Sequence, residues 1–240
     1  MKQSFSRSSR IFLLIVAFFF STAALAQAPP TVEQALQSRG ISENLESIRS
    51  ALTDSRADVR GLAASVLAER NDRESIRPIQ QLLAKSSSNY ERQNLSQALL
   101  KFGDKEGNRG MKALCEDESV QEDLRLIAAN QLHEANDNGC LPAVIKMLSA
   151  TTSVSTTLGC LDFLKHNSAI PAASKSNLRP GLERSLKSED ASTRKAASEC
   201  IARFILKDLA DALRRALFAE RDTAVREQMQ LSLNQLEAGS

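Results

Sequence analysis

The most regular feature of the sequence is an apolar pattern that recurs about every 32 residues. Each copy has an anchor position, followed three and seven residues later by apolar side chains that share one helical face. Successive anchors are 32, 33, 32, 37 and 32 residues apart. The pattern predicts six copies of one amphipathic helix. The anchors are Arg60, Arg92, Arg125, Thr157, Arg194 and Arg226.

A second amphipathic helix is predicted in front of each anchor. Its mark is a pair of apolar residues four positions apart, from Ile48 and Leu52 in the first copy to Leu213 and Leu217 in the last. Short polar turns at 54–56, 86–88 and 188–190 are expected to supply N-cap side chains for the anchored helices. The one irregular spacing predicts a longer loop at 166–177, with about five extra residues and Pro171.

These two helices per copy predict an all-α protein, a right-handed α-solenoid of about six helical hairpins. Residues 27–42 are expected to form a linker or a short capping helix. The six hairpins are expected at about 43–70, 73–102, 106–135, 140–166, 171–204 and 207–237.

The repeat resembles the HEAT repeat, in particular the short bacterial kind seen in bilin lyases. Pro78 and Pro180 both lie fourteen residues before an anchor, and Val59-Arg60 and Val225-Arg226 open the second helix of their hairpins. The resemblance implies an α-α superhelix whose second helices line an extended concave surface. It also implies that the anchor arginines are structural and brace a turn of their own or a neighbouring hairpin.

The N-terminal residues 1–26 have the features of a secretory signal peptide. Lys2, Arg7 and Arg10 precede an apolar run at 11–20, and the segment ends in small residues at Ala24 and Ala26. The run is shorter than the roughly 20 apolar residues that span a membrane. We therefore expect cleavage after Ala26, a periplasmic or secreted location and no stable membrane anchor.

Charge and aromatic content change once the signal peptide is set aside. The remaining chain has 28 Lys and Arg against 29 Asp and Glu, a net charge of −1, and it has no Trp. Proteins that bind nucleic acid need a basic surface and often use stacking aromatics. Nucleic-acid binding is therefore not expected.

All four cysteines lie beyond the signal peptide, where disulfides can persist. Cys115 and Cys160 occupy apolar slots of the repeat, which is typical of buried free thiols. A bond from Cys115 to Cys140 would join opposite ends of two helices, about 15 Å apart, so it is not expected. Cys160 with Cys200, on neighbouring second helices, is the least implausible pair.

Catalytic and metal-binding patterns are weak, and no cofactor is expected. His133-Glu134 resembles the iron-holding pairs of deoxyhypusine hydroxylases, but that family uses several such pairs. Ser192 and Lys195 match a Ser-x-x-Lys pattern without its accompanying motifs. The glycines at 103, 107 and 110 lack the spacing of a phosphate-binding loop.

The sequence therefore predicts an exported interaction module, monomeric and not an enzyme, that binds a protein or peptide through the second helices. The mixed charge of these helices argues against a simple polyanion as the ligand. An accessory factor or enzyme acting on a chromophore, as in the bilin lyases, is the alternative, and a purely structural spacer is a third possibility. The candidate binding residues are Gln93, Gln97, Asn130, Asp162, Lys195, Glu199 and Glu227.

Overall fold

In the computed structural model, the residues described are 31–167 and 170–238, and they form helices and no strand. The predicted signal peptide lies outside these residues. A short helix, α1 (Val32–Gln37), precedes six pairs of helices within the described chain. The first helices of the pairs are α2 (Leu45–Ala51), α4 (Ile76–Lys85), α6 (Lys105–Glu116), α8 (Leu141–Ala150), α10 (Ala172–Ser185) and α12 (Ala210–Ala219). The second helices are α3 (Ala57–Glu69), α5 (Asn89–Lys101), α7 (Glu122–Glu134), α9 (Val154–His166), α11 (Ala191–Arg203) and α13 (Thr223–Ala238).

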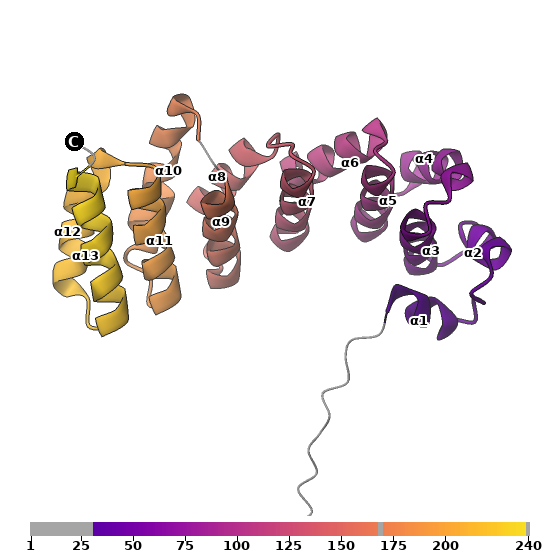
Figure 1. Ribbon diagram of the computed structural model, residues 1–240, viewed down its shortest axis with the longest axis horizontal. Coiled ribbons are helices and arrows are strands. Elements are labelled where there is room, and N and C mark those ends of the chain that lie inside the picture. The colour runs from indigo at the N-terminus through magenta and orange to yellow at the C-terminus, as the bar shows by residue number, and fades with distance from the viewer. Residues whose placement is uncertain (1–30, 168–169, 239–240) are drawn as a thin grey trace, which may run out of the picture. The chain divides into compact units, whose positions relative to one another are not determined.

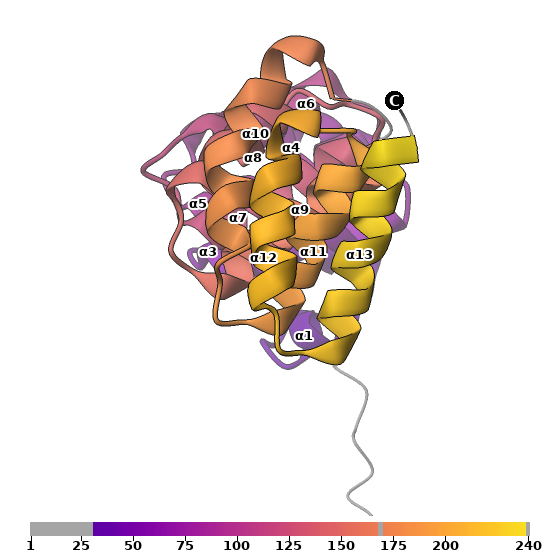
Figure 2. The ribbon, with the colours of Figure 1, turned by 90° about the vertical axis from the view of Figure 1, so that its left-hand side faces the viewer.

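The second helices form one row, because each packs on the next from α3 to α13 (Figure 1). Viewed along the row, α12 and α13 of the last hairpin lie side by side in front of the preceding hairpins (Figure 2). In a stack of this kind each hairpin buries its apolar stripe against its neighbours. The predicted fold class, an all-α helical solenoid, is confirmed.

The turns inside the hairpins follow the N-cap prediction in part. The Ser88 hydroxyl accepts the backbone N–H of Glu91 at the start of α5, and Asp190 accepts that of Thr193 at the start of α11. In the first hairpin, however, the N-cap of α3 is Arg56, which makes no capping bond. Asp54 instead accepts the backbone N–H of Arg56 and a bond from its guanidinium group, so it shapes the turn itself.

The irregular spacing before the fifth hairpin is accommodated differently from the prediction. Residues 172–177 belong to α10, which has 14 residues where α8 has 10. The insertion therefore lengthens a helix and not the connection before it, since 167–171 is no longer than 135–140, the connection between α7 and α8. Pro171 is the N-cap of α10, a position where a fixed φ and a missing N–H cost nothing.

Four of the connections between hairpins share one backbone feature. Asn71, Gly103, Asn136 and Ile205 follow the ends of α3, α5, α7 and α11, and each has a positive φ between 51° and 73°. In each case the next N–H bonds back to a carbonyl of the last helical turn, as Asp72 does to Leu67. Glycine and asparagine tolerate this left-handed conformation, but it is strained for a β-branched residue such as Ile205.

The buried apolar side chains form two clusters. One extends from Leu36 to Phe102 and the other from Met111 to Leu236. The break falls where α6 lies against α5, because a Cβ at Gly107 would be only 2.8 Å from the Leu100 Cα. Such a close approach of two helices leaves no room for large side chains between them.

In residues 31–167 and 170–238, no helix has both the length and the apolar character that a membrane crossing requires.

Candidate functional site

Four of the five anchor arginines donate to backbone carbonyls that precede the second helix of their own hairpin. Arg60 donates to the carbonyls of Asp54 and Ser55 at 2.7 and 2.9 Å, within its own hairpin. Its Nε also donates to the carboxylate of Glu91, in the next hairpin, at 2.6 Å. The Glu91 side chain is 2% exposed, so this ion pair is a buried link between neighbouring hairpins.

Arg194 repeats this arrangement near the other end of the row. It donates to the carbonyls of Ser188 and Glu189. It also forms a bidentate ion pair with Glu220, whose two hydrogen bonds are 2.6 and 2.8 Å long. Arginine forms such paired bonds because two N–H groups of its planar guanidinium group match the two oxygens of a carboxylate. The hydrogen bonds from Arg194 lower the pKa of Glu220 to about 2.

The other anchors make fewer contacts. Arg125 is buried and donates to the carbonyl of Cys115 at 3.0 Å, and Arg226 donates to that of Glu220. Arg92 reaches only the Asn89 side chain of its own helix, at 3.3 Å.

The predicted binding residues are spread along the second helices α5, α7, α9, α11 and α13, and they differ in accessibility. Gln97 is half-buried, and so is Glu199, which forms an ion pair with Lys165 at 3.1 Å. Gln93 departs from the expected surface position. It is 8% exposed, and its amide donates to Gln131 of the next hairpin. The remaining residues are exposed: Asn130, Asp162, Lys195 and Glu227.

The cysteine prediction was wrong. Cys115 is bonded to Cys140, with their Cα atoms 6.1 Å apart, while Cys160 and Cys200 are free and buried. The error was in the register of the helices. The connection at 135–140 runs along α6, where Asn108 donates to Asp137, so α8 begins beside the end of α6 and not beside its start.

The free cysteines are buried, and His133 packs against a neighbouring ring. Burial raises the pKa values of Cys160 and Cys200 to about 12, which keeps both thiols protonated at neutral pH. His133 contacts the Phe163 ring edge-on, at 5.6 Å between centroids, and bonds to the Asn138 side chain. No three His, Cys, Asp or Glu side chains in the described chain are placed to hold a metal ion.

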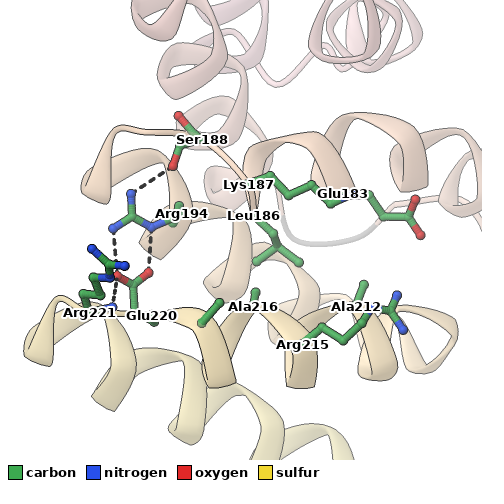
Figure 3. A pocket seen from close by; sticks show the side chains of 11 residues that line it. Glu183, Leu186, Lys187, Ser188, Arg194, Ala212, Arg215, Ala216, Glu220 and Arg221 are labelled. Atoms are coloured by element: carbon green, nitrogen blue, oxygen red, sulfur yellow. Dashed lines mark hydrogen bonds and ion pairs between the residues drawn. The ribbon is translucent and has the colours of Figure 1, made fainter.

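A groove of about 650 Å³ lies between α10 and α12 (Figure 3). Leu186 lies on the α10 side of it, and Ala212, Ala216 and Ala219 line the α12 side. Arg194 and Glu220 lie at one end. The sequence analysis missed this groove, although a signal exists: the alanines recur at helical spacing where larger apolar residues would fill the gap.

Known proteins share the fold of this chain but not its sequence. No protein-family model and no curated protein matches it. A designed armadillo repeat protein, solved in complex with the peptide (KR)4, aligns over 81% of this chain and 100% of its own, with a TM-score of 0.52 and 14% identity. Human deoxyhypusine hydroxylase aligns over 85% of this chain and 89% of its own, with 17% identity, but its TM-score of 0.40 supports no argument. At this level of identity the likeness to the armadillo protein establishes the fold alone.

Proposed function

We propose that this protein is an exported, non-enzymatic scaffold that binds a protein or peptide through the row of second helices. The observation that supports the proposal most is the row itself. Asn130 of α7 and Asp162 of α9 are exposed five residues after their anchors, and Lys195 of α11 and Glu227 of α13 are exposed one residue after theirs. A rigid row of this kind offers an extended docking surface. The armadillo repeat protein of similar fold was solved with a peptide bound, which is consistent with this use of the fold.

The mechanism we propose is docking on a preformed surface. The inter-hairpin ion pairs of Arg60 and Arg194 and the disulfide between Cys115 and Cys140 hold neighbouring hairpins together. A surface that is already ordered loses little conformational entropy when a partner binds. The exposed side chains Asn130, Asp162, Lys195 and Glu227 would set the specificity of that docking.

The test is affinity capture from an envelope or culture-supernatant extract, using the exported protein and a variant with four alanine substitutions. We expect the wild-type protein to retain a specific partner and the variant to lose it without a change in melting temperature. The substituted residues are Asn130, Asp162, Lys195 and Glu227.

A control variant carries four alanine substitutions on exposed residues outside the second helices. It should capture the same partner as the wild-type protein. Equal capture by the second-helix variant, or loss of capture by the control, would show that the row of second helices is not the docking surface. The control residues are Arg77, Gln81, Lys105 and Asp208.

A further inference from the structure

The groove between α10 and α12 lies apart from the candidate residues of the second helices. Its walls come from α10, from α12 and from the residues that follow these helices, together with Arg194 of α11. None of the seven candidate binding residues lines it. Any ligand of the groove would therefore bind independently of a partner docked on the second helices.

The rim of the groove has an excess of positive charge. Lys187, Arg215 and Arg221 all line it, and none forms an ion pair with another described residue. The two carboxylates in the lining are already paired, Glu183 with Arg179 at 2.9 Å and Glu220 with Arg194.

The helix termini offset only part of this charge. Lys187 and Arg221 follow the ends of α10 and α12, and each helix C-terminus carries roughly half a negative charge. Against three cations, this leaves the groove with a net charge of about +2. An anionic ligand is therefore favoured over a neutral or cationic one.

The floor of the groove is apolar. Leu186 and the methyl groups of Ala212, Ala216 and Ala219 form a surface that cannot bond to phosphate or to sugar hydroxyls. Burying it needs an apolar group on the ligand, which gains about 25 cal/mol for each Å² removed from water. The volume of about 650 Å³ is within the range of sites that hold a short peptide or a molecule of similar size.

We propose that this groove binds an acidic peptide segment of a partner protein. An apolar side chain of the segment packs on Leu186 and the alanines, and flanking carboxylates pair with Lys187, Arg215 and Arg221. Arginine suits this role because its guanidinium group can bond both oxygens of a carboxylate. The segment lies between α10 and α12, with the ion pair of Arg194 and Glu220 at one end of the groove (Figure 3).

The test measures binding of a fluorescein-labelled heptapeptide, Glu-Glu-Leu-Glu-Leu-Glu-Glu, to the full chain by fluorescence anisotropy. Lys187, Arg215 and Arg221 are replaced together by alanine. Loss of three partly exposed ion pairs should raise Kd by about tenfold or more. The melting temperature should not fall, because these cations have no partner within the described residues. Raising the salt concentration should weaken binding to the wild-type protein.

Two further variants separate the groove from other surfaces. Ala216→Leu fills the floor without changing the charge, and it should also raise Kd by about tenfold, since it excludes the apolar side chain. The second-helix variant with alanine at Asn130, Asp162, Lys195 and Glu227 should bind the heptapeptide as tightly as the wild-type protein. Failure of the partner capture described above would leave this result untouched.

The proposal is overturned by any of three results. The first is an absence of saturable binding by the wild-type protein up to about 1 mM peptide. The second is equal binding by the wild-type protein and the Lys187, Arg215 and Arg221 variant. The third is equal competition by a hexa-glutamate peptide or by inorganic polyphosphate, which would identify a general anion site without a peptide preference.

Discussion

Two neighbouring junctions between hairpins are built in different ways. At the junction of the fourth and fifth hairpins, α10 packs closely on α8, and only a smaller hollow of about 400 Å³ remains, near Pro142 and Pro180. A Cβ at Gly181 would lie 2.7 Å from the Leu148 Cγ and 3.0 Å from the Leu148 carbonyl oxygen. At the junction of the fifth and sixth hairpins, α10 and α12 stay apart and enclose the larger groove.

The two junctions also differ in the contacts that hold the neighbouring hairpins together. At the closed junction Arg184 of α10 donates to the carbonyls of Leu148 and Ser149 at the end of α8. At the open junction, between the fifth and sixth hairpins, the hairpins are held together by the ion pair of Arg194 with Glu220 and by the packing of α11 on α13. A few small residues therefore decide whether two neighbouring repeats pack closely or leave a groove between them.

The largest effect is expected from breaking the ion pair of the open junction. Arg194→Ala leaves the Glu220 carboxylate, whose side chain is 3% exposed, without its cation. Removing one partner of a buried ion pair costs about 3–5 kcal/mol of unfolding free energy. Urea denaturation measures it. Arg215→Ala, in the same groove, should change stability by less than about 0.5 kcal/mol. Equal effects of the two variants would show that the pair does not fasten the junction.

Acid should weaken the same junction more gently. Because hydrogen bonds from Arg194 lower the pKa of Glu220 from 4.5 to about 2, its contribution is complete above about pH 4.5 and is lost as the pH falls towards 2. Melting temperatures at pH 7 and pH 3 measure this loss.

The control for the pH experiment is Glu220→Gln, which does not titrate. Asp54 also has a pKa of about 2, because Arg56 donates to it, and it contributes equally to both proteins. The variant should therefore lose less stability between pH 7 and pH 3 than the wild-type protein. A loss of the same size would mean that Glu220 is not responsible.

A larger side chain should destabilise the closed junction more than the open one. Gly181→Ala at the closed junction forces Leu148 to move, and overpacking of this kind costs about 1–3 kcal/mol. The larger change Ala216→Leu extends into the open groove and should cost less than about 0.5 kcal/mol. Denaturant midpoints for the two variants give the comparison directly. A costly Ala216→Leu would mean that the groove has no room for the added atoms.

The smallest effect concerns the connection that leads into the sixth hairpin. Ile205 has a φ of 51°, and Asn136, at the corresponding place after α7, has a φ of 61°. Ile205→Asn should raise stability by about 1 kcal/mol, since asparagine tolerates this conformation. The reverse change, Asn136→Ile, should lower it by a similar amount. A stability loss in Ile205→Asn would show that the isoleucine side chain makes packing contacts that outweigh the strain.

The repeating apolar pattern was enough to predict the solenoid because stacking of like hairpins depends on the spacing of side chains along each helix. Anchors such as Arg60 and Arg194 could be located by their register for the same reason. Their partners could not, because Glu91 and Glu220 occupy different positions relative to the next anchor. An ion pair between hairpins depends on which side chains of neighbouring hairpins come close together, and the repeat pattern does not specify this.

The fold class, the number of hairpins and the face that each helix buries could be predicted from the sequence, since these follow from helical periodicity. The pairing of the cysteines, the burial of Gln93 and the position of the groove became clear only from the three-dimensional packing. These features depend on how far one hairpin is shifted relative to the next, and this offset is shorter than a helix. That offset is set jointly by residues far apart in the chain, such as Leu148 and Gly181, whose close approach no local pattern encodes.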